Sequence, residues 1–203
     1  MRIRILVVFS FILFFLCSLS VFSEECPKTG TSFDALIKEA YDTRTKFIEV
    51  DLSVDNGVNI FKDFYATVME KSEEEKEEIM AMTDSSFFVI IADSSVKAAV
   101  KEKLTEDSKA TLDTLKIKMD DALSDLRVAN DAALELSKKI PEAIKKLPSE
   151  LKGMNAMKIP KVKAALEKAK GWMDDIKIQF TQDAEVVNTV LGVIGFLFAE
   201  DVE

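Results

Sequence analysis

A heptad stripe in the second half of the chain constrains the fold more than any other feature. Apolar residues recur there in alternating steps of three and four: Leu112, Leu115, Met119, Ala122, Leu126, Ala129, Ala133, Leu136 and Ile140. A 3.5-residue repeat keeps one narrow apolar seam on a single face of an α-helix. Such a seam has to be buried against other helices or against lipid. The stripe therefore predicts a long helix over residues 105–140 that needs a partner.

The rest of the chain also favours helix. Only 6 glycines and 4 prolines occur in 203 residues, and no segment alternates apolar and polar residues as a half-buried strand does. A second stripe predicts a last helix over residues 161–199, with Pro160 in its first turn. This stripe consists of Val162, Leu166, Ala169, Met173, Ile176, Phe180, Ala184, Val187, Leu191, Ile194 and Phe198. We expect an all-α bundle of four or five helices, in which these two long amphipathic helices pack antiparallel.

The first part of the chain predicts shorter helices separated by turns. Ser32 can cap a first helix over residues 33–51. The Asp-Asn-Gly sequence at 55–57 is typical of a turn, so we expect it to end this helix. A second helix is expected to begin near Val58.

Two further patterns follow this second helix. Ser72 and Glu75 form a capping-box pattern, at which a helix restarts unless the preceding one runs through. The spacing leaves open whether residues 58–82 and 84–102 form one continuous helix. Five consecutive apolar residues, Phe87–Ile91, would be apolar on every side of a helix. They predict a helix that is buried at the centre of the bundle.

The N-terminus has the layout of a secretory signal peptide. A basic start with Arg2 and Arg4 precedes the apolar stretch 5–16, and the small residues before position 24 predict cleavage after Ser23. The alternative is an uncleaved anchor, because about 18 apolar residues begin to span a bilayer. We favour cleavage of residues 1–23, and therefore expect a secreted, extracellular protein.

The mature chain is expected to form a single domain. Residues 24–31 would be an irregular leader and residues 32–203 one helical-bundle domain. Cys26 is the one cysteine of this part, because Cys17 leaves with the signal peptide. A lone thiol can stay free, be capped or form an intermolecular disulfide. A homodimer through Cys26 is an alternative that the sequence does not favour.

Lysine and proline concentrate between the two long helices. Pro141 and Pro148 are expected to interrupt helix in a connector over residues 138–160. Ten lysines against three glutamates give residues 138–170 a net charge of +7, whereas the whole chain carries −9. The interpretation that we favour is internal, with the connector close to acidic helices whose charge it offsets. The other is contact with an anion or a lipid headgroup through Lys145, Lys146, Lys158 and Lys161.

Composition excludes several classes of function. Histidine is absent, which excludes Ser-His-Asp and Cys-His catalysis and the usual zinc sites. Neighbouring carboxylates such as Asp120 and Asp121 point about 100° apart on a helix, so they do not converge on one substrate. Residues 51–57 resemble the start of a calcium loop, but its twelfth position is Lys62. Excess negative charge disfavours nucleic acid. We expect no enzyme, no metal and no cofactor.

The remaining features favour a non-enzymatic binding protein for lipid, fatty acid or another apolar ligand. They are the abundant apolar helix faces, the basic connector and secretion without disulfide bracing. Residues expected to line either the ligand or the core are Phe87, Phe88, Ile91, Ala122, Ala129, Ala133, Val187, Leu191, Ile194 and Phe198. An alternative is a structural or interaction protein that self-associates or pairs with a partner through its helix seams. A third is a membrane-active helical protein.

Overall fold

The computed structural model describes residues 25–152 and 158–199, and every regular element in these two ranges is an α-helix. Three helices are long: α2 (Asp34–Val68), α6 (Glu106–Glu150) and α7 (Lys158–Phe198). Three are short: α3 (Glu73–Ala81), α4 (Asp84–Ala92) and α5 (Ser94–Glu102). The predicted all-α class is confirmed. The predicted signal peptide, residues 1–23, lies outside the described residues.

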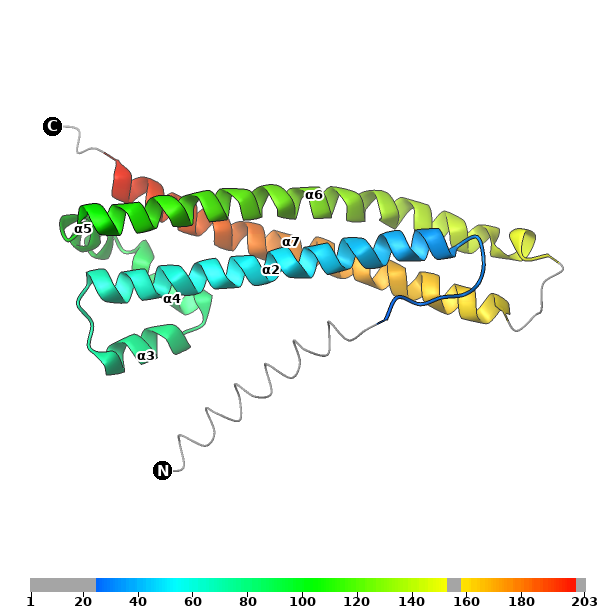
Figure 1. Cartoon of the computed structure of the whole chain (residues 1–203), viewed down its shortest axis with the longest axis horizontal. Helices are drawn as coiled ribbons and strands as arrows, with labels where there is room; N and C mark the ends of the chain where they lie inside the picture. The colour runs from blue at the N-terminus through cyan, green and yellow to red at the C-terminus, as the bar shows by residue number, and fades with distance from the viewer. Residues whose placement is uncertain (1–24, 153–157, 200–203) are drawn as a thin grey trace, which may run out of the picture.

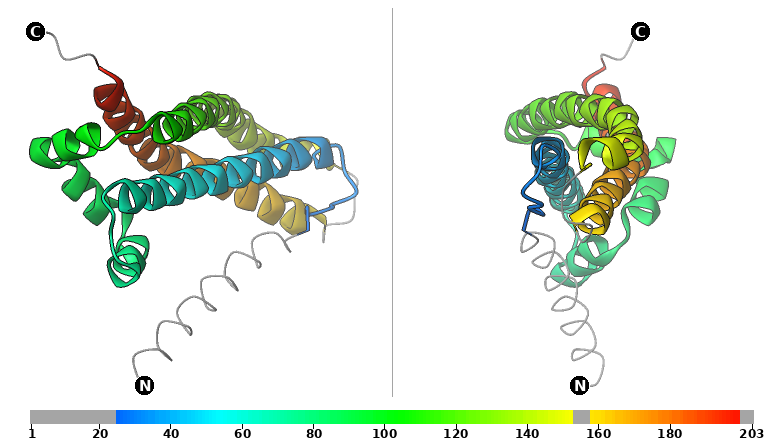
Figure 2. Two further views of the ribbon diagram at one scale, coloured as in Figure 1. Left: turned by 60° about the vertical axis from the view of Figure 1, so that its left-hand side comes forward. Right: turned by 90° about the vertical axis from the view of Figure 1, so that its right-hand side faces the viewer.

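The three long helices lie side by side and enclose the main core (Figure 1). Every residue of the heptad stripe from Leu112 to Ile140 is buried against α2 and α7. Figure 2 shows the long helices from two further sides, with the short helices gathered at one end of the bundle. In the two described ranges, no helix has a stretch that is long and apolar enough to cross a bilayer.

The predicted break at residues 55–57 is wrong, because α2 continues through it without interruption. Gly57 is buried there, with α6 close beside it. A Cβ atom at this position would lie 3.0 Å from the Sδ atom of Met119 and would also overlap its terminal methyl group. The glycine therefore serves close helix packing, and the burial of Val54 and Val58 on either side holds the helix together.

The predicted connector is also largely wrong. Pro141 and Pro148 both lie inside α6, which ends only at Glu150. A proline removes one backbone hydrogen bond and crowds the preceding turn. The apolar seam nevertheless continues past both prolines, since Ala143, Leu147 and the following Leu151 are buried. Burial of this continuing seam offsets the local cost and keeps the last turns helical.

The short helices begin at predicted and at unexpected caps. The capping box of Ser72 and Glu75 is confirmed, and it starts α3 after a break in the chain. Thr83 caps α4, and Asp93 ends α4 while capping α5. Residues 58–82 and 84–102 are therefore not continuous helices.

Helix α4 is not the central helix that its apolar sequence predicts. Phe87 and Ile91 are buried, but Val89 is 75% exposed. The long helices already fill the centre of the bundle, so α4 packs one face against its side at one end (Figure 2). Its apolar character reflects two buried positions rather than burial on all sides.

Residues 25–31, which precede α2, contain no helix or strand. The N-cap of α2 is Phe33 rather than Ser32, and its side chain makes no capping hydrogen bond. The carboxylate of Asp34 instead accepts hydrogen bonds from the backbone N–H groups of Thr29 (2.8 Å) and Gly30 (2.9 Å). These bonds fold the leader back onto the first turn of α2.

Candidate functional site

An apolar pocket lies at the end of the bundle where α4 and α5 pack on the long helices. Its apolar lining comes from four helices and consists of Phe61, Phe64, Tyr65, Ile91, Val96, Val100, Val193 and Leu197. Lys97 adds a charged side chain to this lining. The cavity measures only about 10 Å³, roughly the space that one water molecule needs. Side chains therefore fill the pocket while α4 and α5 are in place.

A buried lysine attaches the start of α4 to α2. Lys62 is 3% exposed, and its ammonium donates hydrogen bonds to the carbonyl of Met82 (2.7 Å) and to the carboxylate of Asp84 (2.8 Å). The same ammonium lies 6.0 Å from the ring centre of Phe87. Phe87 in turn packs edge-on against Phe61 at a ring separation of 5.9 Å. One cation and one aromatic ring thus hold the corner between α3 and α4.

Helix α5 is attached to the end of α7 by two lysines. The ammonium groups of Lys97 and Lys101 lie 5.1 and 5.8 Å from the ring centre of Phe196. Lys101 also donates a hydrogen bond of 2.6 Å to the carbonyl of Ala199, just after α7 ends. Lys97 therefore lies at the edge of the pocket, between its apolar lining and solvent.

A cluster of three carboxyl groups lies further along the bundle, where α2 and α7 face each other. Asp183 is 5% exposed; its Oδ1 accepts a hydrogen bond from Gln179 (2.9 Å), whereas its Oδ2 has no partner among the described residues. Burial, and then the charge of Asp51, raise the pKa of Asp183 to about 7. Burial also raises the pKa of Asp51.

Asp55 completes the cluster one turn further along α2. Burial of its carboxyl group, followed by the charges of Asp51 and Asp84, raises its pKa to about 6, although its side chain still reaches solvent. The carboxyl groups of Asp51 and Asp183 interact directly. Two such groups in a poorly solvated place share a proton more readily than they ionise together. Within the described ranges, no group of three or more acidic or cysteine side chains is arranged to hold a metal ion.

Sequence reasoning missed the functional candidates Lys62, Lys97 and Asp183. For Lys62 and Asp183, the spacing of the neighbouring apolar residues could have indicated burial. Lys62 lies four residues after Val58 and three before Tyr65, and Asp183 lies seven residues after Ile176 and four before Val187. A charged residue at an apolar-stripe position is a candidate for burial with a partner or with a shifted pKa.

The predicted ligand-lining residues do not converge on one cavity. Ile91 lines the apolar pocket, and Ala122 lines an open, largely polar groove of about 330 Å³ between α2 and α6. The others lie within the packed core or at its edge: Phe87, Ala129, Ala133, Val187 and Ile194 are buried, and Phe88, Leu191 and Phe198 are half-buried.

The predicted anion-contacting lysines lie at the opposite end of the bundle from the pocket. Lys145, Lys146, Lys158 and Lys161 are all exposed. Lys161 lines an open groove of about 730 Å³ together with Glu25, Cys26, Lys28 and Tyr41. Cys26 is half-buried in this groove as a free thiol, and burial followed by the charge of Asp42 raises its pKa. A raised pKa keeps the thiol protonated and less reactive.

Comparisons with known proteins add no assignment to this geometry. No protein-family model, no curated protein and no solved structure matches the chain.

Proposed function

We propose that this protein is a secreted, non-enzymatic binding protein for an apolar ligand with an anionic head, such as a fatty acid. The observation that carries the proposal is the apolar pocket between α4, α5 and the long helices, with Lys97 at its edge. Eight apolar side chains supply a surface for an acyl chain, and one ammonium can pair with a carboxylate. This combination of an apolar lining with a single charged group is typical of small-molecule sites.

Binding requires α4 and α5 to move, because the closed pocket holds about 10 Å³. Each of these helices has nine residues, and helices shorter than about 12 residues are marginal without tertiary packing. Their attachment rests largely on Lys62, Phe87 and Lys101. In this proposal α2, α6 and α7 form the stable frame, with α6 and α7 as an antiparallel pair, and the α4–α5 unit opens.

Opening would uncover an apolar surface that belongs to the frame itself. Phe61 and Phe64 of α2 and Val193 and Leu197 of α7 line the pocket from the frame side. Lifting α4 and α5 off these residues leaves the seam between α6 and α7 intact. A ligand chain could replace the contacts of Ile91 and Val100 without unfolding the bundle.

The test uses delipidated protein and a fluorescent fatty acid. We expect saturable binding, and we expect Val96→Phe, which enlarges a half-buried side chain of the lining, to weaken it at least tenfold. Val89→Phe is the matched control, because Val89 lies on the neighbouring helix and is 75% exposed. Lys97→Gln should weaken binding of a fatty acid more than that of the corresponding fatty alcohol. No binding by the wild-type protein, or equal binding by the Val96→Phe variant, would show the proposal to be wrong.

A second candidate function is association through a helix face. Ile117 and Val128 on α6 are 62% and 53% exposed, and their spacing of eleven residues places them three turns apart on one face. They lie outside the buried heptad seam, so a partner helix could pack on them without opening the bundle. Light scattering of the wild type and of Ile117→Ser tests this candidate function. It predicts that the wild type is a dimer and that the variant is a monomer.

A further inference from the structure

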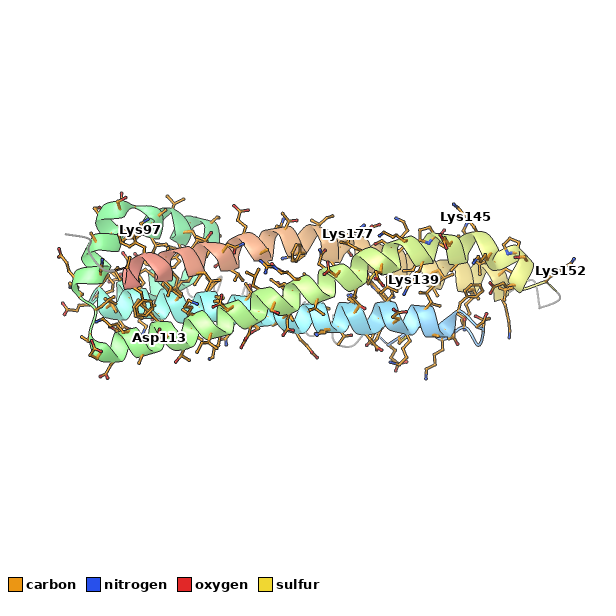
Figure 3. All side chains as sticks on the ribbon, turned by 90° about the horizontal axis from the view of Figure 1, so that it is seen from above. Lys97, Asp113, Lys139, Lys145, Lys152 and Lys177 are labelled. Atoms are coloured by element: carbon orange, nitrogen blue, oxygen red, sulfur yellow. The ribbon has the colours of Figure 1, made fainter. Side chains whose placement is uncertain are left out.

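The lysines of the α6–α7 end differ from most others in having no acidic partner among residues 25–152 and 158–199. Along the rest of the bundle, most lysines pair with acids, as in Lys116–Asp120 (2.7 Å) and Lys170–Asp174 (2.7 Å). The lysine tip, which we define as Lys145, Lys146, Lys152, Lys158 and Lys161, forms no ion pair with any described residue. Figure 3 shows Lys145 and Lys152 at the end of the bundle, beyond Lys139, which still reaches Glu39 at 3.6 Å.

Acidic side chains offset only part of the charge of the basic segment, since Lys139 pairs with Glu39 of α2 and Lys163 with Glu167. The stretch 138–170 carries +7, and the rest of the chain therefore carries −16 to reach the total of −9. The exposed acids nearest in sequence, Glu142 and Glu150, form no ion pair with the tip among the described residues. The positive charge thus remains available to a partner, while the remainder of the molecule repels the same partner.

We propose that the lysine tip docks the protein, end-on, to a bilayer that contains anionic phospholipids. The large apolar side chains that are exposed elsewhere in the described ranges, such as Val89, Ile117 and Ile178, all lie outside residues 138–170. A protein partner would need an apolar anchor at the centre of its interface, and none of the described residues 138–152 and 158–170 is an exposed large apolar side chain. Lysines on flexible stems suit a phosphate surface that requires no fixed geometry. The lysine tip shares no residue with the apolar pocket, which lies at the opposite end of the bundle.

Vesicle co-sedimentation tests the proposal on the chain recovered from secreting cells. We expect binding to vesicles of 70% phosphatidylcholine and 30% phosphatidylserine at low salt, and little binding to pure phosphatidylcholine. The quadruple variant Lys145→Gln, Lys146→Gln, Lys158→Gln, Lys161→Gln should lose this binding, because each lysine contributes about fivefold to the affinity. Raising the salt concentration from 50 to 300 mM should weaken wild-type binding strongly, since the Debye length shortens.

A matched control separates the tip from net charge. The variant Lys38→Gln, Lys71→Gln, Lys109→Gln, Lys116→Gln removes the same charge from lysines that pair with acids three or four residues away in the sequence. It should bind vesicles as the wild type does. Equal loss in both variants, or equal binding to neutral and anionic vesicles, would overturn the proposal. Binding to poly-glutamate without binding to anionic vesicles would also overturn it, in favour of an acidic protein partner.

Discussion

Replacing Asp183 with asparagine should stabilise the protein at pH 8, even though the substitution removes an ionisable group from a highly charged chain. The carboxyl group is 5% exposed, and its pKa is raised from 3.8 to about 7. A raised pKa means that folding favours the protonated form. The stabilising contribution is therefore full below pH 3.8 and is lost as the pH rises through 7.

The magnitude follows from the size of this shift. Three pKa units correspond to at most about 4 kcal/mol between the protonated and the ionised form. Between pH 5 and pH 8 the folded protein passes through most of this titration, whereas the unfolded chain is already ionised. The wild type should therefore be about 2.5 kcal/mol less stable at pH 8 than at pH 5 on account of Asp183. An asparagine side chain at this position cannot ionise, and its amide can donate a hydrogen bond to Asp51.

Urea unfolding at pH 5 and pH 8 measures the effect. We expect the advantage of Asp183→Asn over the wild type to be larger at pH 8 than at pH 5 by about 2.5 kcal/mol. Asp55 titrates in the same direction, with a pKa of about 6, so the variant keeps a smaller pH dependence. Acids with a lowered pKa, such as Asp174, stay ionised throughout this range. The control is Asp175→Asn on the exposed face of α7, which should leave the pH dependence unchanged.

Two results would show that Asp183 is not destabilising when it is ionised. One is a wild-type stability that stays constant or rises from pH 5 to pH 8. The other is an Asp183→Asn variant that is less stable than the wild type at pH 8, because a charge there would then contribute favourably to the fold.

Two further predictions concern packing. Gly57→Leu should destabilise the protein by about 1–3 kcal/mol in urea unfolding, because the leucine side chain would overlap Met119. In the double variant, Met119→Ala should restore part of this lost stability. If the two losses of stability simply add, the overlap with Met119 is not their cause. Lys62→Met keeps the side-chain length but removes both hydrogen bonds. It should speed the exchange of backbone amide hydrogens in α4 while those of α6 stay protected. Unchanged exchange in α4 would show that Lys62 does not hold this helix.

Sequence patterns of short range predicted much of the local structure. The alternating spacing of apolar residues is a property of one helix, so it predicted α6 as far as residue 140 and nearly all of α7. Capping depends on side chains three residues apart, and the box at Ser72 and Glu75 was therefore also predictable. The all-α class followed from the same local preferences.

Features that depend on neighbouring helices were not predictable in this way. Gly57, Pro141 and Pro148 are locally unfavourable for helix, and only burial against other helices shows why the chain continues through them. Likewise, the sequence places Lys62 and Asp183 at apolar spacing but does not say which groups they meet. Their contacts come from segments more than twenty residues away, as with Asp84, or from another long helix, as with Asp51.

The sequence by itself thus determined that this protein is helical, which faces are apolar and where its positive charge is concentrated. Tertiary structure decided which charges are paired, which apolar helix is central and where a pocket lies. The physical reason is the distance along the chain over which each interaction acts. Helix propensity, capping and periodicity act over one or two turns, whereas burial, ion pairing and pKa shifts depend on groups that only the folded chain brings together.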